Sequence, residues 1–149
     1  MGDDNPAPRF QHIVDALPAG FDDLRTEAGE EGHRFVDRLA ADWAAGRMRF
    51  NGHGEMLLAG YMDGELAGIG GLTTEPAVPG ALRMRRFYVR RSYRRSGVGR
   101  QLALMLLERT WSVTDLVTVN AQPDSFPFWQ SLGFIPDPRD GRTHTQAGR

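Results

Sequence analysis

One stretch of the sequence combines glycines and arginines in a way that suits the binding of phosphate groups. It is FYVRRSYRRSGVGRQL, residues 87–102, a pattern typical of a strand, a basic turn, a glycine loop and the start of a helix. Gly97 and Gly99 lack a Cβ, so a ligand can approach the main chain closely. The first amides of a helix have no intrahelical acceptor, and the helix dipole adds positive potential there. The segment therefore predicts an anion site at a helix start.

Three arginines near this loop add full positive charges and forked donors for phosphate oxygens. They are Arg94, Arg95 and Arg100. The pattern is not the GxxxxGK[ST] P-loop, because the chain contains no lysine. It is also not GxGxxG after a first strand, which disfavours a Rossmann dinucleotide site. The plain structural alternative is a glycine turn with arginines that face the solvent.

The basic residues are unevenly distributed along a chain whose formal net charge is −1. Residues 83–100 hold 8 Arg and no acidic residue, whereas residues 1–82 hold 6 Arg and 14 acidic residues. Such a local block favours an anionic partner, while the balanced total argues against a general polyanion binder. Nucleic-acid binding is disfavoured, because the block spans a strand and a turn rather than a recognition helix, and few aromatic residues interleave with it.

Length and composition limit the class of protein. The 149 residues suggest one domain, and we expect a disordered lead-in over residues 1–8 and a single domain over 9–149. The absence of cysteine excludes disulfides, Cys-based zinc sites and a thiol nucleophile. No apolar run is long enough to span a membrane and the N-terminus does not resemble a signal peptide, so we expect a cytoplasmic protein. The four histidines lack metal-ligand spacing, so no metal is expected.

Apolar periodicity and turn residues predict a mixed α/β fold that alternates too irregularly for a doubly wound sheet. Asp63-Gly64, between two apolar runs, is a typical hairpin turn. His33, on the edge of a helix, could line a site, but an exposed position is favoured. Residues 142–145 could form a last strand near a substrate site, but we expect an exposed tail. Strands are expected over residues 9–17, 56–61, 66–72, 82–89, 116–120 and from 134 onward, and helices over 21–27, 32–45, 100–111 and 125–132.

Two motifs, in order and on the expected elements, carry a resemblance to a known family. Residues 94–99, RRSGVG, fit the R/Q-x-x-G-x-G/A motif, and residues 128–134, FWQSLGF, fit an aromatic pair followed by Gly-Phe. Over about residues 9–135 the chain resembles the GNAT superfamily of acyl-CoA-dependent N-acyltransferases. The resemblance implies a mixed α/β fold. Its central, mostly antiparallel sheet would splay between the fourth and fifth strands and carry helices on both faces.

The resemblance implies specific contacts with acetyl-CoA, the co-substrate of this family. Amides of the glycine loop would hold the pyrophosphate, with Arg94 and Arg95 beside the phosphates. The pantetheine arm would lie in the gap between the two splayed strands. The residues implied as cofactor-binding are Phe87, Tyr88, Val89, Arg94, Arg95, Ser96, Gly97, Val98, Gly99, Arg100, Asn120, Phe128 and Trp129.

The resemblance also implies the reaction, in which the amine of an acceptor attacks the thioester directly in a ternary complex. A main-chain amide near Val89 would polarise the thioester carbonyl. Trp129 stands where many family members have a Tyr that protonates the departing thiolate, and an indole does not titrate near neutral pH. The acid is then Ser125, Tyr88 or a water molecule. This departure also leaves open a CoA-binding module with little activity.

The second departure concerns the base and the acceptor. Arg85 and Arg83 stand at the strand positions where family members carry a Glu or His base, and arginine cannot accept a proton near neutral pH. We expect them to bind a carboxylate or phosphate of a small acidic amine; the alternative is exposure, or pairing with the acidic N-terminal half. The base is then Glu75, Glu55 or a water chain. A protein acceptor is a less favoured alternative, and a homodimer is compatible with the sequence.

Overall fold

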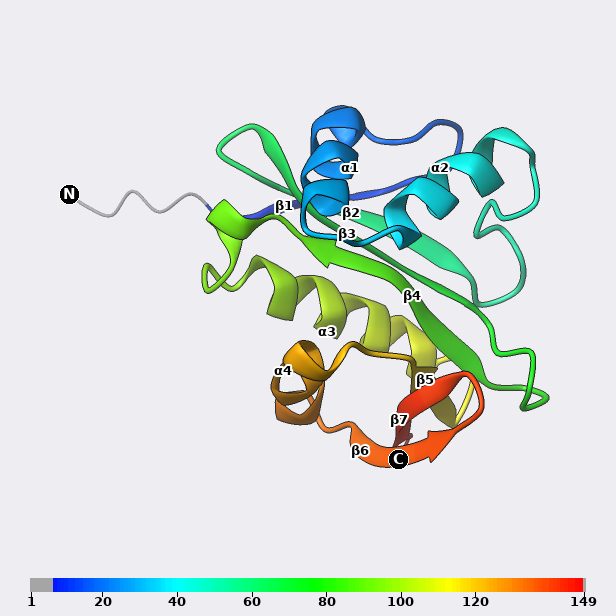
Figure 1. Ribbon diagram of the computed structural model, residues 1–149. Coiled ribbons are helices and arrows are strands. Elements are labelled where there is room, and N and C mark those ends of the chain that lie inside the picture. The colour runs from blue at the N-terminus through cyan, green and yellow to red at the C-terminus, as the bar shows by residue number, and fades with distance from the viewer. Residues whose placement is uncertain (1–6, 149) are drawn as a thin grey trace.

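The computed structural model describes residues 7–148, which form one seven-stranded sheet with helices packed on it (Figure 1). Two short 3₁₀ turns, Arg91–Tyr93 and Pro123–Ser125, precede the last two helices. The elements in chain order are β1 (Arg9–His12), α1 (Phe21–Glu30), α2 (Phe35–Ala44), β2 (Met56–Met62), β3 (Glu65–Thr74), β4 (Leu82–Val89), α3 (Val98–Trp111), β5 (Leu116–Val119), α4 (Phe126–Ser131), β6 (Ile135–Arg139) and β7 (Arg142–Ala147).

The sheet has the strand order β1-β2-β3-β4-β5-β7-β6, and its only parallel pair in the described part of the chain is β4 with β5. The β2–β3 hairpin turns at Asp63-Gly64, where both residues have positive φ, as a type I′ turn requires. This mixed, mostly antiparallel sheet confirms the fold class expected from the sequence. None of the helices in residues 7–148 is long and apolar enough to cross a membrane.

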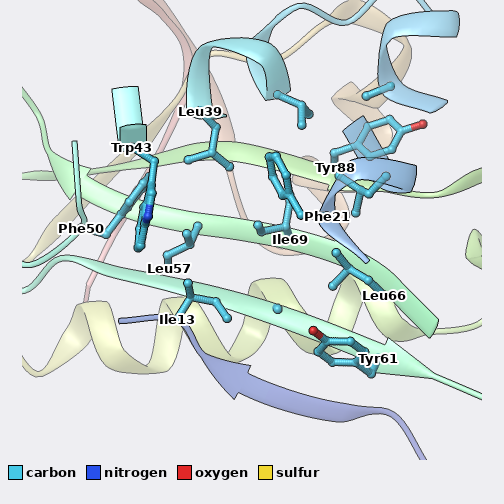
Figure 2. Close-up of a cluster of buried hydrophobic side chains, with 14 residues drawn as sticks. Ile13, Phe21, Leu39, Trp43, Phe50, Leu57, Tyr61, Leu66, Ile69 and Tyr88 are labelled. Carbon is cyan, nitrogen blue, oxygen red and sulfur yellow. The ribbon is translucent and has the colours of Figure 1, made fainter. Parts of the chain in front are cut away.

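Two hydrophobic cores lie on opposite faces of the sheet, because side chains of a strand alternate between faces. Leu57 and Ile69 point toward α1 and α2, where they meet Leu39 and Trp43 (Figure 2). Leu58 belongs to the other core, which is formed with α3 and α4. The α3 side chains Leu102 and Leu106, one helical turn apart, are fully buried there. The helices therefore cover both faces, as expected (Figure 1).

Glycine within β3 has a packing role that positions the future site. A Cβ on Gly70 would lie 2.5 Å from Cδ2 of Phe87, so the aromatic ring rests directly on the main chain of β3. Phe87 in turn contacts Phe128 and Trp129, with ring centroids 5.6 Å and 4.9 Å apart. The glycine thus lets β4 and α4 share one aromatic cluster.

The C-terminal region differs from the sequence expectation. Residues 142–145 belong to β7, which inserts between β5 and β6, and His144 is only 1% exposed. The expectation of an exposed tail is therefore wrong. The strand looks polar, yet two of its polar side chains are paired: Gln130 lies 3.1 Å from His144 Nε2, and Thr143 bonds to the main chain at Val119 and Ala121. Oε1 of Gln146 is buried without a partner. The expected lead-in over residues 1–8 falls mostly on residues 1–6, outside the described part.

Candidate active site

A cleft opens where the parallel strands β4 and β5 separate. Leu82 pairs with Val117 and Met84 with Val119, but β5 ends there while β4 continues to Val89. The resulting cleft has a volume of about 1150 Å³. Its walls come from β4, the α1–α2 connection, the loop before α3, the segment after β5, and α4. Such a cavity is large enough for a cofactor-sized ligand.

A β-bulge in β4 determines which side chains face the cleft. Arg85 lies opposite Gly71 and Tyr88 opposite Ile69, so two residues of β4 share a single partner position on β3. Arg86 takes up the extra residue with φ of +56°, which is uncommon for a residue with a Cβ. Bulges are frequent next to functional sites, where they redirect side chains.

The main-chain N–H of Val89 points into the cleft. The next amide, that of Arg90, donates to the carbonyl of Ala67 on β3 at 2.8 Å. Successive amides of a strand point to opposite edges, so the amide of Val89 faces away from β3. On that edge β4 has no strand partner, because β5 has already ended. An unpaired N–H here is a donor for an oxygen atom of a ligand.

The loop before α3 presents free amides to the same cleft. Arg95 and Gly97 both have positive φ, +67° and +91°, a feature shared with the backbone of anion-binding nests. Within the described residues, the amides of Gly97, Gly99 and Arg100 have no acceptor. The amides of Ser96 and Val98 are engaged internally, with Tyr93 O at 3.3 Å and Ser96 Oγ at 3.3 Å.

Gly99 fixes the position of this helix start against β4. A Cβ on it would lie 3.0 Å from Cγ2 of Val89 and 3.7 Å from the ring of Phe128. Gly97, by contrast, has open space around a Cβ position, and its positive φ is what favours glycine. The two glycines of the motif therefore serve different physical purposes.

Arg94 acts as a brace. Its guanidinium donates to both oxygens of Glu31, at 3.0 and 2.5 Å, and its Nε donates to the carbonyl of Val89 at 2.9 Å. The ion pair lowers the pKa of Glu31 to about 2 despite partial burial. Arg95 and Arg100 also line the cleft, and neither has an ion-pair partner among residues 7–148.

The hydroxyl of Tyr88 points to α1. It donates to Glu31 at 2.5 Å and to Glu27 at 3.2 Å, and burial together with these carboxylates raises its pKa. A phenol so placed is a poor proton donor to a thiolate. Ser125 lies in the cleft lining, where its hydroxyl donates to Gln122 O at 2.8 Å.

Aromatic side chains form the wall of the cleft opposite β4. Trp129 is 4% exposed, and its ring lies edge-on to Phe87, Phe128 and Phe134 at centroid distances of 4.9, 4.9 and 5.4 Å. Asn120, immediately after β5, is exposed and lines the same cleft. The segment after β5 and α4 therefore lie together on one side of the gap, as the resemblance implied.

Arg83 and Arg85 line the end of the cleft nearest the start of β4, on the face of β4 that carries α2. Neither forms an ion pair in the described part of the chain, whereas Arg86 pairs with Asp42 at 3.3 Å. Burial, followed by the neighbouring arginines, lowers the pKa of Arg85 from its usual value. Its Nε is buried and has no hydrogen-bond partner.

Glu75 and Glu55, the carboxylates considered as bases, are committed to structural bonds. Glu75 accepts from the hydroxyl of Thr118 at 2.8 Å and from Ala77 N at 2.7 Å, and these bonds outweigh burial to lower its pKa. Glu55 accepts from Gly52 N and Thr74 N at 3.1 and 2.9 Å. The lining of the cleft contains neither of them, so we assign neither a part in the reaction.

His33 is a half-buried cleft residue, whereas the sequence favoured an exposed position on the edge of a helix. The periodic pattern placed it inside a helix from residue 32, but α2 begins only at Phe35. His33 instead lies in the connection between α1 and α2 and lines the cleft, with ring centroids 5.8 Å from Tyr88 and 5.4 Å from Phe35. The glycine just before it, Gly32 with φ of +84°, was the local sign of a helix end.

The family of the chain follows from comparison with known proteins. A family model for the acetyltransferase (GNAT) domain matches residues 23–145. The chain belongs to the GNAT acetyltransferase family. Both motifs found in the sequence, at residues 94–99 and 128–134, lie within the matched range, which confirms the resemblance. No match was found among curated proteins.

No group of three His, Cys, Asp or Glu side chains suited to a metal ion occurs in residues 7–148.

Solved GNAT structures share the fold. A proposed acetyltransferase from Exiguobacterium sp. 255-15 has 20% identity and a TM-score of 0.87 over 95% of this chain and 94% of its own. ElaA of Escherichia coli has 22% identity and a TM-score of 0.67, over 96% and 100% of the two chains. An acetyltransferase from Streptococcus agalactiae has 13% identity and a TM-score of 0.73, over 94% and 98%.

Proposed function

We propose that this GNAT protein is an N-acetyltransferase that moves an acetyl group from acetyl-CoA to a primary amine of a small-molecule acceptor. The observation that carries the proposal is the edge of β4 from Arg85 to Val89. It has no strand partner, and it runs along a cleft that reaches the free amides at the start of α3. An extended arm can pair with such an edge, and a pyrophosphate can bind at such a helix start.

The cofactor-binding part of the proposal divides the loop residues by their contacts. The amides of Gly97, Gly99 and Arg100 would receive the pyrophosphate, while Ser96 and Val98 shape the loop through their internal bonds. The side chains of Arg95 and Arg100 would add charge beside the phosphates. Arg94 would act through the loop, because Glu31 already holds its guanidinium.

The pantetheine arm would lie between β4 and the opposite wall of the cleft. Main-chain groups at Phe87 and Val89 would bind it on one side, with Tyr88 between them anchored to α1. The other side would be Asn120 and the rings of Phe128 and Trp129.

In the proposed reaction, the lone pair of the amine attacks the thioester carbonyl carbon; a C–N bond forms and the C–S bond breaks. The electron pair of that bond leaves with sulfur, and the amine nitrogen loses one proton. The N–H of Val89 is positioned to hold the negative charge that develops on the carbonyl oxygen. Donors fixed in this way need no reorganisation during the reaction, and each commonly contributes about 10²–10³ in rate.

Two proton transfers accompany the bond changes. His33 is the histidine of the cleft lining, and histidine is the residue type that most often exchanges protons near neutral pH. We therefore propose that His33, together with water, accepts the proton that the amine loses. The departing thiolate takes its proton from water in the cleft through the hydroxyl of Ser125, which receives a proton as it gives one and so does not remain an alkoxide. Because a thiol has a pKa near 8.5, this second transfer contributes little to the barrier.

The test pairs a cofactor-binding measurement with a turnover measurement. Gly97→Val places a β-branched side chain at a position with positive φ, which distorts the loop that carries the free amides. We therefore expect acetyl-CoA affinity, measured by calorimetry, to fall at least about tenfold. Gly80→Val is the matched control, because Gly80 also has positive φ, +83°, but lies outside the cleft lining. Unchanged affinity in Gly97→Val would remove the cofactor site.

Turnover is measured as thiol release with a panel of primary amines. Acetylation of at least one small amine supports the proposed activity. Binding of acetyl-CoA without thiol release across the whole panel would instead identify a CoA-binding module. Trp129 favours this second candidate function, because it stands where many family members have a tyrosine that protonates the thiolate.

A further inference from the structure

A second, smaller cavity lies beside the cleft, between β3, β4 and the segment that follows α2. Its volume is about 300 Å³. Arg85 lines this cavity and also the cleft, so its side chain stands at the boundary of the two. Other polar residues of its lining are Arg47, Arg49, Asn51, Thr73 and Thr74. We refer to this space as the side cavity.

Two buried polar atoms of the side cavity have no hydrogen-bond partner. They are Oγ1 of Thr73 and Nε of Arg85. Thr73 is opposite Arg83, and Gly71 is opposite Arg85, so these side chains stand on one face of neighbouring strands. Buried polar groups are nearly always paired in folded proteins, and an unpaired one calls for an explanation such as a ligand.

The charges around the side cavity leave Arg85 as its unpaired cation. Arg47 pairs with Asp42 at 3.1 Å, and Arg49 donates to the carbonyl of Trp43 at 3.0 Å. Among the arginines of the lining, all of which are described, only Arg85 has no acceptor. The carboxylate of Glu55 is turned to main-chain amides at Gly52 and Thr74. An anion entering the cavity would therefore meet Arg85 without having to displace an existing partner.

We propose that Arg85 and Thr73 form an anion subsite in the side cavity, which binds a carboxylate or phosphate of the amine acceptor. The inference rests on the proposed acetyltransferase activity and specifies its substrate class. Arg85 supplies a forked pair of donors and Thr73 supplies a hydroxyl, a set that suits either anion. The cavity volume of about 300 Å³ admits the charged group with a few neighbouring atoms.

The position of the subsite along β4 sets the shape of the acceptor. Val89, whose amide faces the proposed reaction centre, is four residues from Arg85. The bulge sets these four steps of β4 against three steps of β3, so they span about 10 Å, and the arginine side chain shortens the gap to be bridged. The amine and the anion of the acceptor are therefore separated by several bonds. The subsite favours amines with a distant acid group over α-amino acids.

The experiment uses matched pairs of acceptors with the full chain. One ladder is glycine, 4-aminobutyrate and 6-aminohexanoate, each compared with the neutral alkylamine of similar length. An aminoalkyl phosphonate of the same length separates phosphate-like from carboxylate recognition. We expect the wild-type kcat/KM ratio of acidic to neutral acceptor to rise along the ladder.

Three variants test the residues. Arg85→Gln should lower the acid-to-neutral ratio about 10- to 100-fold, the loss typical of a hydrogen bond to a charged group. Thr73→Val, which keeps the shape and removes the hydroxyl, should lower it about 3- to 10-fold. Arg91→Gln is the control: it removes an exposed arginine of the same basic block that lines neither cavity, and the ratio should stay unchanged.

A binding measurement separates the failure of the subsite from the failure of the activity. Calorimetric titration of 6-aminohexanoate and hexylamine into the wild type and Arg85→Gln needs no turnover. Binding of the acid that Arg85→Gln abolishes supports the subsite even if no amine is acetylated, in which case the proposed function alone fails. Equal binding or equal turnover of acidic and neutral amines by the wild type would overturn the subsite. An acid preference that survives in Arg85→Gln would overturn it as well.

Discussion

The two ends of the cleft are both rich in arginine, yet they are built in opposite ways. At the start of α3, free main-chain amides face the cleft and the nearest motif arginine, Arg94, is already paired with Glu31. At the end lined by Arg83 and Arg85, the main chain of β3 and β4 is paired in the sheet, and the unpaired donors are side chains such as Arg85. In the proposed function, one end would recognise its ligand through main-chain amides and the other through guanidinium groups.

The contrast explains how a single block of eight arginines can serve two ligands. A site made from amides tolerates few backbone changes but depends little on any single side chain. A site made from side chains keeps its fold after substitution but loses its selectivity. The first kind suits a cofactor common to a family, and the second suits an acceptor particular to one protein.

The largest effect is expected where the main-chain site is distorted. In Gly99→Val the new side chain would push α3 away from β4, because Cγ2 of Val89 lies only 3.0 Å from the position that a Cβ would occupy. We expect acetyl-CoA affinity to fall about 100-fold, since several anion contacts are lost together. Arg95→Gln and Arg100→Gln should each cost only about three- to tenfold, the value of an exposed charged contact. Calorimetry measures the acetyl-CoA affinity of all three variants. If either arginine variant lost more affinity than Gly99→Val, side chains rather than main-chain amides would dominate binding at the start of α3.

The next largest effect is expected at the ion pair between Arg94 and Glu31. Glu31 joins the α1–α2 side of the cleft to Arg94, and its pKa is lowered from 4.5 to about 2. A lowered pKa means that the ionised form stabilises the fold above about pH 4.5, and that this stability is lost as pH falls toward 2. In Glu31→Gln we expect the free energy of unfolding at pH 7 to drop by on the order of 1–3 kcal/mol, with a flatter decline below pH 4.5.

Urea denaturation between pH 7 and 2.5 measures this difference. Glu30→Gln is the matched control, because Glu30 forms only an exposed pair with Arg91 at 3.8 Å. Such surface pairs contribute about 0–1 kcal/mol, so the control should follow the wild-type curve closely. If Glu31→Gln gives that same curve, the ion pair does not brace the cofactor loop.

A smaller effect is expected at the proposed proton acceptor. In His33→Asn, kcat/KM for a neutral amine should fall about tenfold near neutral pH, with water carrying the remaining proton transfer. A comparison of parameters distinguishes this role from a packing role: kcat for the amine should fall while acetyl-CoA affinity and the free energy of unfolding stay the same. A loss of acetyl-CoA affinity or of stability in this variant would mean that His33 only packs against Tyr88 and Phe35.

The same contrast governs what could be predicted from the sequence. The shape of the loop before α3 was predictable because its signal is local: Gly97 stands where φ is positive, and Gly99 where the helix meets β4. The directions in which the side chains of Arg85 and Arg86 point depend on a β-bulge. Because Arg86 itself takes the positive φ at this bulge, no glycine in the sequence indicates where the bulge lies. The side cavity also joins Thr73 and Arg85 to residues 46–51, which only the three-dimensional fold brings together.

The buried C-terminal strand was missed for a related reason. The apolar pattern that predicts burial is absent from β7, whose sequence is RTHTQA. Its burial is possible because specific partners satisfy the side chains of His144 and Thr143, although Oε1 of Gln146 has no partner. Nδ1 of His144 lies 2.8 Å from the hydroxyl of Thr143, and that hydroxyl donates to Val119 O. Such pairing depends on tertiary structure, so it leaves no periodic signal in the sequence.

The smallest effect is expected at Trp129, and it tests whether the aromatic wall of the cleft contributes shape or proton transfer. The indole is packed edge-on against three phenylalanine rings, so its main contribution is shape rather than proton transfer. In Trp129→Phe we expect kcat to change less than about threefold, because the thiolate is a good leaving group without a dedicated acid. Ser125→Ala should lower kcat more than this variant does, with KM for acetyl-CoA unchanged. Trp129→Tyr restores a hydroxyl at the position common in the family; if it raises kcat more than tenfold, protonation of the thiolate limits the rate and Ser125 is not the acid.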